Sequence, residues 1–168
     1  DIFIQYFNAH PEMKLIIAPH VVSEGHLTEI MSKLQRPCIR YTQATEENVQ
    51  QADCLIIDCY GLLSSIYRYG EISYIGGGFG VGIHNVLEAA VYGIPVIFGP
   101  NNKKFREAQH LLEKKGGFEI NSYGDFEQLM DRFLTDEAYL KQAGETAGSY
   151  VKDNSGAMKM IMKNVFFK

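Results

Sequence analysis

The residues best suited to chemistry lie in one glycine-rich stretch near the middle of the chain. Five of the seven residues from Gly76 to Gly82 are glycine. Glycines at this density permit positive φ angles and a close approach of a ligand to the backbone, although they cost conformational entropy on folding. After the loop, Asn85 can cap a helix whose first N–H groups point toward an anion. The stretch therefore predicts a loop that binds phosphate.

Asn85 and Glu88 add a second polar feature to this loop. Because they are three positions apart, they share one face of the predicted helix. The carboxylate of Glu88 can accept hydrogen bonds from the two vicinal hydroxyls of a ribose, so the loop and the pair together predict a nucleotide. The alternative is that the glycines make only a tight turn and that Glu88 is solvated. Val81 stands where the dinucleotide fingerprint that starts at Gly76 needs its third glycine, and no P-loop motif occurs.

Predicted strands and helices alternate along the chain and position these residues. Short apolar runs predict strands, and apolar residues at helical spacing predict helices. The alternation repeats about six times, which indicates an α/β fold, a Rossmann-like doubly wound parallel sheet of about six strands. We expect the sequence 1–168 to form a single domain. The expected strands are residues 14–18, 38–41, 54–58, 72–75, 95–98 and 118–120.

Helices are expected between these strands and after them, at residues 1–10, 23–34, 62–69, 85–91, 105–112 and 126–134. We expect Asp125 to cap the helix at 126–134, and Gly116 and Gly117 to end the helix at 105–112. Two further helices close the chain, and the final one carries an apolar stripe: Met158, Ile161, Met162, Val165 and Phe166. This stripe predicts docking onto a domain, with attachment to a membrane surface as the alternative.

Two more polar residues lie at the carboxyl ends of predicted strands. His20 follows the first strand, and Asp58 closes the third. Open α/β sheets bind ligands at this edge, so both residues are candidates for the nucleotide site. For His20 the alternative is a surface histidine in a loop.

Composition excludes several classes of function. The net charge of −4 argues against binding to nucleic acid or to an anionic membrane through a general positive field. Cys38, Cys54 and Cys59 lack C-x-x-C spacing, which predicts reduced thiols in the cytoplasm and no metal site. Because no apolar run reaches about 18 residues and no signal peptide is apparent, we expect a chain that neither spans a membrane nor is exported.

Six motifs are spread over most of the chain: Ala18-Pro19-His20, Asp58-Cys59-Tyr60-Gly61, Gly76-Gly77-Gly78, Gly82-Ile83-His84-Asn85-Val86-Leu87-Glu88, Gly93-Ile94-Pro95-Val96-Ile97-Phe98-Gly99-Pro100 and Gly156-Ala157. In these motifs the chain resembles the carboxyl-terminal half of the bacterial Kdo transferases, which add 3-deoxy-D-manno-octulosonic acid (Kdo) to lipid A precursors. The resemblance implies the C-terminal, donor-binding half of a GT-B glycosyltransferase. In that fold two Rossmann-like domains face each other, and the second holds the sugar nucleotide, here CMP-Kdo.

The resemblance also implies roles for particular residues. Glu88 would hold the ribose, and His84 and Asn85 would bind the phosphate. Pro19 and Gly61 would line the cytidine pocket together with the first three glycines of the loop. The donor-nucleotide site predicted in this way comprises Pro19, His20, Asp58, Gly61, Gly76, Gly77, Gly78, Ile83, His84, Asn85 and Glu88.

The chain departs from the family pattern at three positions. The family often has Arg at the position of His20, an acidic residue at Leu62 and Pro at Ala89. The role of His20 in binding charge is the expectation most affected by these changes.

The implied reaction is an inverting transfer, in which a lipid A hydroxyl attacks the anomeric carbon of Kdo and CMP leaves. The family's catalytic carboxylate and acceptor site lie in the amino-terminal domain, so we expect no catalytic residue here and no activity of this chain alone. We expect that domain, and one strand ahead of residue 1, to lie outside the chain. No metal or cofactor is expected.

The implied partners are CMP-Kdo and, through the other domain, the lipid A precursor (lipid IVA) and the membrane. The implied location is the cytoplasmic face of the bacterial inner membrane, with this fragment itself soluble. Two other functions stay open at this point: the donor domain of a UDP-sugar GT-B glycosyltransferase, and a non-catalytic nucleotide-binding α/β module.

Overall fold

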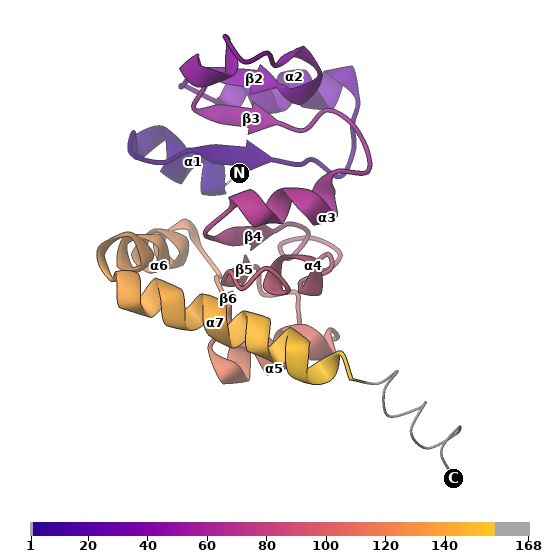
Figure 1. Cartoon of the computed structure of the whole chain (residues 1–168), viewed down its shortest axis with the longest axis vertical. Helices are drawn as coiled ribbons and strands as arrows, with labels where there is room; N and C mark the ends of the chain where they lie inside the picture. Colours follow the sequence, from indigo (N-terminus) through magenta and orange to yellow (C-terminus); the bar gives the residue numbers. More distant parts are fainter. Residues whose placement is uncertain (1, 157–168) are drawn as a thin grey trace. The chain divides into compact units, whose positions relative to one another are not determined.

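The computed structural model describes residues 2–156 and divides the chain into two units, Asp1–Ile66 and Tyr67–Lys168 (Figure 1). Each unit contains one parallel sheet of three strands, and each is described by itself. Six strands alternating with helices confirm the predicted α/β class with parallel sheets, distributed as three strands plus three. The single domain expected over 1–168 stays a prediction.

The first unit is built around the sheet β1-β3-β2, in which both strand pairs are parallel. Its elements are α1 (Ile2–Ala9), β1 (Leu15–Ile17), α2 (Glu24–Lys33), β2 (Cys38–Arg40), the 3-10 turns η1 (Tyr41–Gln43) and η2 (Val49–Gln51), β3 (Cys54–Ile56) and α3 (Leu63–Ile66). Ser23 caps α2 as predicted, because its Oγ accepts a hydrogen bond from the N–H of His26.

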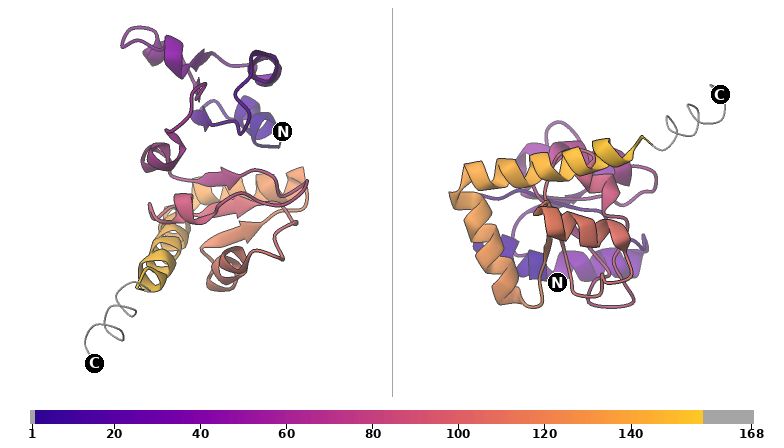
Figure 2. Two further views of the ribbon diagram at one scale, coloured as in Figure 1. Left: turned by 90° about the vertical axis from the view of Figure 1, so that its right-hand side faces the viewer. Right: turned by 90° about the horizontal axis from the view of Figure 1, so that it is seen from below.

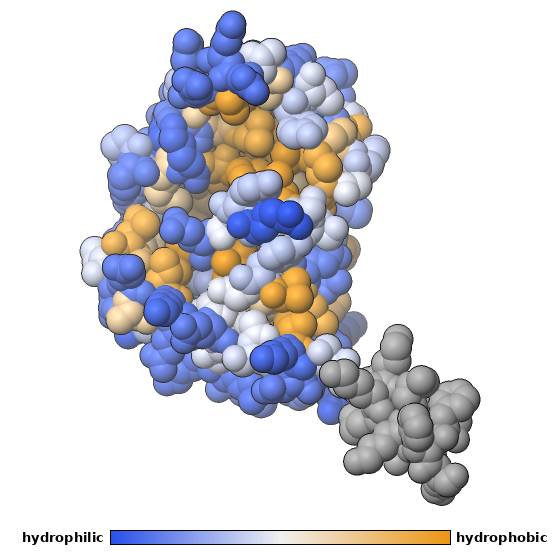
Figure 3. All heavy atoms as spheres, in the orientation of Figure 1, coloured by the Kyte–Doolittle hydropathy of each residue, from blue (hydrophilic) through white to orange (hydrophobic). Residues whose placement is uncertain are grey.

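The two faces of this sheet differ in burial. One face packs against α1 and α2 in a core that contains Ile4, Phe7, Ile17, Leu27, Ile30, Cys54 and Ile56. Alternate residues point to the other face, where Ile16, Leu55 and Ile39 are neighbours in register. Ile16 is 37% exposed, and Figure 3 shows hydrophobic residues gathered over these strands.

The second unit is built around the sheet β4-β5-β6, which is also parallel. Its elements are the 3-10 turn η3 (Tyr67–Tyr69), β4 (Ser73–Ile75), α4 (Leu87–Ala90), β5 (Val96–Phe98), α5 (Arg106–Lys114), β6 (Gly117–Glu119), α6 (Tyr123–Thr135) and α7 (Glu137–Asn154). The long helix α7 packs against α4, α5 and α6 (Figure 2).

Helices cover both faces of the second sheet. On one face Ile75, Val96 and Phe98 share a core with residues of α4, α5 and α7. On the other face Tyr74 and Phe118 make edge-to-face contacts with Phe126 and Phe133 of α6, at ring-centroid distances of 5.9 and 5.2 Å. This unit therefore has the helix–sheet–helix layering that the predicted doubly wound fold requires.

Three local predictions need correction. Ser122, not Asp125, caps α6: its Oγ accepts from the N–H of Asp125, whose carboxylate accepts from the N–H of Asn121. Lys115, rather than Gly116, ends α5 in the left-handed conformation, with φ of 65°. The helix expected at 62–69 is divided into α3 and η3.

Two predictions concern the end of the chain and the membrane. The amphipathic helix expected around residues 158–166 lies outside the described residues. Within residues 2–156, no helix has the length and apolar content needed to cross a membrane.

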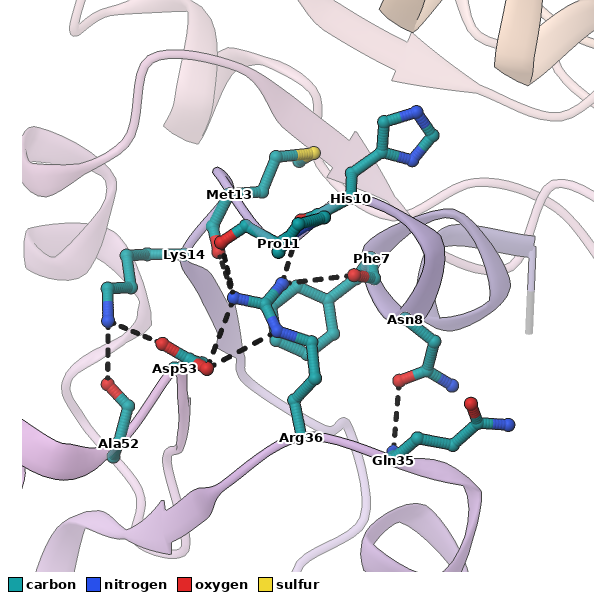
Figure 4. A network of polar contacts seen from close by, with 10 residues as sticks. All are labelled: Phe7, Asn8, His10, Pro11, Met13, Lys14, Gln35, Arg36, Ala52 and Asp53. Carbon is teal, nitrogen blue, oxygen red and sulfur yellow. Dashed lines mark hydrogen bonds and ion pairs between the residues drawn. The ribbon is translucent and has the colours of Figure 1, made fainter.

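One arginine holds the first unit together around the turn between α1 and β1 (Figure 4). The guanidinium of Arg36 pairs with Asp53 and lies 4.0 Å from the centre of the Phe7 ring. It also donates hydrogen bonds of 2.8 to 3.0 Å to four backbone carbonyl oxygens, those of Phe7, His10, Pro11 and Met13. The carbonyls of Phe7 and His10 also accept backbone N–H groups, from His10 and Met13, so Arg36 adds a second donor to each and joins the turn to a side chain that is distant in sequence.

We predict that Arg36→Lys lowers the free energy of unfolding by about 2 to 4 kcal/mol, because a lysine cannot replace the fork of donors to the four carbonyls and leaves Asp53 with Lys14 as its ion-pair partner. Urea titration of the two proteins measures this. Arg40→Lys is the matched control, since the salt bridge of Arg40 within residues 2–156 is to Glu24, whose side chain is 80% exposed, and a lysine keeps the positive charge near Asp58; it should cost at most about 0.5 kcal/mol. Equal losses in both variants would contradict the role assigned to Arg36.

Candidate functional site

The glycine loop, residues 76–82, leaves β4 and folds back on itself. The carbonyl oxygen of Gly77 accepts hydrogen bonds from the N–H groups of Gly80 and Gly82, at 2.9 and 3.2 Å. Gly77 has φ of 87°, and a Cβ atom at this position would lie 2.2 Å from the carbonyl oxygen of Gly82. The turn therefore requires glycine at residue 77 for both conformation and space.

The same loop is in direct backbone contact with the segment that follows β5. A Cβ atom on Gly78 would lie 2.5 Å from the Gly99 nitrogen, and one on Gly99 would lie 2.7 Å from the Gly78 carbonyl carbon. The Phe79 ring lies against Gly99, and the Phe105 ring lies against Gly82. Gly78, predicted to line a ligand pocket, is buried in this contact.

Asn85 organises the start of α4. Its Oδ1 accepts a hydrogen bond from the N–H of Leu87, and its Nδ2 donates one to Oε1 of Glu88, both at 3.0 Å. The predicted shared face of Asn85 and Glu88 is thus confirmed, while the N-cap position of α4 is Val86, and Asn85 bonds the helix start from one residue earlier. Because a carboxylate has about four lone-pair sites, Glu88 can still accept hydrogen bonds from a ligand.

Individual N–H groups, rather than a long helix, determine what this turn can bind. Helix α4 has only four residues, so its macrodipole is small. The N–H of His84 already donates to the carbonyl oxygen of Gly76 at 3.2 Å. Within residues 2–156, the N–H groups of Asn85 and Val86 have no hydrogen-bond acceptor. The exposed His84 ring lies beside Gly77, at 3.6 Å from the position of a Cβ atom there.

Two residues support this region from the core of the second unit. The side chain of Ile83 is only 4% exposed and belongs to that core, so only its backbone can approach a ligand. Tyr67 packs against the same core. Burial raises the pKa of Tyr67 to about 12, and the negative charge of Glu88 contributes to this rise. Sequence reasoning missed Tyr67, because no local pattern connects it with Glu88.

In the first unit, the candidates lie at one edge of the sheet. Strands β1 and β3 are parallel neighbours, and a hydrogen bond of 2.8 Å from Ile57 N–H to Ile17 O extends their pairing. Residues that follow the two strands therefore lie at the same carboxyl edge, as predicted. These residues are Pro19, His20, Asp58 and Gly61, the last with φ of 90°.

Asp58 is engaged with a neighbouring strand end. Its carboxylate accepts hydrogen bonds from the backbone N–H of Thr42 at 2.9 Å and from its hydroxyl at 2.5 Å. Burial on its own raises the pKa of Asp58, but the hydrogen bonds from Thr42 and the charge of Arg40 outweigh it, so the pKa is lowered. Asp58 thus ties the ends of β2 and β3 together.

The cysteines and the acidic residues give no sign of a metal centre in the described part of the chain. Among residues 2–156, no three His, Cys, Asp or Glu side chains are grouped as metal ligands would be; chemistry without a metal stays a prediction. Cys38, Cys54 and Cys59 are free thiols. Burial raises the pKa of Cys54 to about 12, which keeps that thiol protonated.

Comparisons with known proteins place this geometry in context. No family model matches the chain. A 3-deoxy-D-manno-octulosonic acid transferase of Aquifex aeolicus is 29% identical over 155 residues, which cover 89% of this chain and 42% of that protein. The predicted resemblance to Kdo transferases is confirmed. The Kdo transferase of Haemophilus influenzae is 26% identical over 91% of this chain and 36% of its own length. The chain therefore spans about two fifths of the length of the Kdo transferases it matches.

Solved structures support the fold. The crystal structure of the C-terminal CMP-Kdo binding domain of WaaA from Acinetobacter baumannii matches with a TM-score of 0.71 at 19% identity, over 89% of this chain and 79% of that one. A sucrose-phosphate synthase from Thermosynechococcus elongatus matches with a TM-score of 0.54 at 12% identity, over 93% of this chain and 46% of the synthase. The predicted fold, that of the C-terminal half of a GT-B glycosyltransferase, is confirmed.

We predict that Gly78→Ala destabilises the protein by about 1 to 3 kcal/mol, because its methyl group must displace backbone atoms of Gly99. Gly80→Ala is the matched control in the same loop, since the nearest atom to a Cβ there is 3.6 Å away; it should change stability by at most about 0.5 kcal/mol. Urea unfolding measures both. A tolerated Gly78→Ala variant would show that the two backbones are not held in contact.

We also predict that acid destabilises the protein partly through Asp58. Its folded-state pKa is lowered, so its contribution is present above the unfolded pKa of about 3.9 and is lost as the pH falls through the folded pKa. Asp58→Asn should therefore lose stability at about pH 7 and show a smaller further loss between about pH 6 and pH 2 than the wild type. Urea midpoints across this range provide the measurement, and parallel profiles for the two proteins would refute the prediction.

Proposed function

We propose that this chain is the donor-binding domain of an inverting glycosyltransferase that moves Kdo from CMP-Kdo to a lipid A precursor in lipopolysaccharide biosynthesis. One observation carries the proposal: the sequence is similar to Kdo transferases over about nine tenths of its length. The shared fold with a domain described as binding CMP-Kdo supports it.

In this proposal Glu88 holds the ribose of CMP. Its carboxylate is fixed by Asn85, so little side-chain entropy is lost when a ligand binds. The carboxylate accepts hydrogen bonds from the two ribose hydroxyls, which are donors in a cis arrangement that suits its two oxygens. Asn85 would then act as a bridge, because it holds both the helix start and the ribose-binding acid.

The phosphate of CMP is proposed to lie at the turn before α4. Within residues 2–156, the N–H groups of Asn85 and Val86 have no acceptor and can serve as donors there. The exposed His84 side chain lies beside Gly77. Donors fixed in this way stabilise the charge that CMP carries as it leaves, because they need no rearrangement during the reaction.

The remaining assignments follow the resemblance. Pro19, His20, Asp58 and Gly61 stay predictions as nucleotide-binding residues of the first unit. We place no catalytic residue in this chain, and we propose that the catalytic carboxylate, the acceptor site and the contact with the cytoplasmic face of the inner membrane belong to another domain. Transfer is proposed to need neither metal nor cofactor.

Glu88→Ala should weaken CMP binding by about 1 to 3 kcal/mol, because hydrogen bonds to a charged group are lost. Calorimetric titration of CMP into the full chain measures this. Glu113→Ala, an exposed glutamate of α5, is the matched control and should bind CMP as the wild type does. Unchanged CMP affinity in a folded Glu88→Ala variant would remove Glu88 from the ribose site.

The same titration tests the donor class. UMP and UDP are measured beside CMP on the wild-type chain. CMP should bind most tightly of the three. Tighter binding of UDP would favour the donor domain of a UDP-sugar glycosyltransferase, and no binding of any of them would overturn the proposed function.

A further inference from the structure

The glycine loop cannot hold its own shape with side chains. Five of its seven residues have none. Of the other two, Val81 is fully exposed, and Phe79 is 50% exposed. Glycines also gain the most conformational freedom when a loop opens. Apart from its own backbone turn on Gly77, the groups that fix this loop for a ligand must therefore come from outside it.

Asn101, in the segment between β5 and α5, makes two hydrogen bonds to the loop. Its backbone N–H donates to the carbonyl oxygen of Gly78 at 2.9 Å, and its side-chain Nδ2 donates to the carbonyl oxygen of Gly80. The two carbonyls lie on either side of Phe79. Together with the turn that closes on Gly77, these bonds fix the backbone of the loop at both its middle and its inner end.

Asn102, the next residue, anchors this segment to the core. It is completely buried, and its Nδ2 donates to the carbonyl oxygen of Gly99 at 2.9 Å and to Oε2 of Glu119 at 2.7 Å. Its Oδ1 accepts a hydrogen bond from Gln109 of α5. The two asparagines thus have different roles. Asn102 fixes the segment to the core, and Asn101 bonds the loop to that fixed segment.

We propose that the Asn101 side chain is a positioning residue, which sets the conformation of the glycine loop and through it the affinity for the nucleotide phosphate. The part of the inference that concerns affinity rests on the proposed function; the part that concerns the conformation of the loop does not. Loop and helix start are continuous in the chain, and the N–H of His84 is bonded to Gly76. A loop released from Asn101 therefore leaves the donors of Asn85 and Val86 less well oriented.

Asn101→Ala tests this, with Asn154→Ala as the matched control. The side chain of Asn154 also donates a hydrogen bond from Nδ2 to one carbonyl oxygen, that of Tyr150 at 2.7 Å, at the end of α7.

Two quantities are measured on the full chain: amide hydrogen exchange of Gly80 and Gly82 without ligand, and the affinity for CMP. Asn101→Ala should speed exchange of both amides about fivefold to tenfold and weaken CMP binding by a similar factor, with an unchanged urea midpoint. Asn154→Ala should leave exchange and affinity within about twofold of the wild type.

The outcomes separate the inference from the function on which it rests. If loop exchange and CMP affinity are unchanged in Asn101→Ala, the positioning role is overturned while the proposed function stands. If the wild type binds no CMP, the proposed function falls, and loop exchange still decides whether Asn101 holds the loop. Should Asn101→Ala lower the urea midpoint, Asn101→Asp, which keeps the size but turns an acceptor toward the Gly80 carbonyl, must reproduce the faster exchange, or the inference fails.

Discussion

The second unit depends on the contact between the backbones of Gly78 and Gly99, where neither residue leaves room for a Cβ atom. This contact brings the loop after β4 against the segment after β5, so the ends of two adjacent parallel strands form one continuous backbone surface. A single methyl group at either position would separate them. Two aromatic rings lie close to the same loop and segment, Phe79 against Gly99 and Phe105 against Gly82.

The candidate site is built from fixed polar groups on this surface. Helix α4 is too short for a strong dipole, so the N–H groups of Asn85 and Val86, which have no acceptor in the described part of the chain, matter individually. Asn85 supports both the first turn and the carboxylate of Glu88. Burial and the charge of Glu88 raise the pKa of Tyr67 to about 12. The site is therefore prepared before any ligand arrives, which lowers the entropy lost on binding.

In the first unit, charged residues serve the fold. Arg36 donates hydrogen bonds to carbonyl groups around the end of α1 and pairs with Asp53. The hydrogen bond from Lys14 lowers the pKa of Asp53, and the charge of Arg36 adds to this effect. Asp58, which the sequence predicts to be a ligand-binding residue, accepts hydrogen bonds from Thr42. A position at the carboxyl edge of a sheet thus indicates where polar groups gather, but it does not separate binding groups from groups that join strand ends.

The sequence by itself determined the alternation of helices and strands and several relations that span one helical turn, although the cap of α6 was predicted at the wrong residue. The order of helices and strands along the chain, the cap at Ser23 and the pair Asn85 and Glu88 follow from apolar periodicity and from spacings of three or four residues, since these depend only on local backbone geometry. Only the tertiary structure decided the contacts between Gly78 and Gly99, between Asn101 and Gly80, and between Arg36 and the carbonyls near α1. Each of these joins residues of different elements, and the strand order that brings them together is fixed by packing of the whole sheet, which no local pattern records.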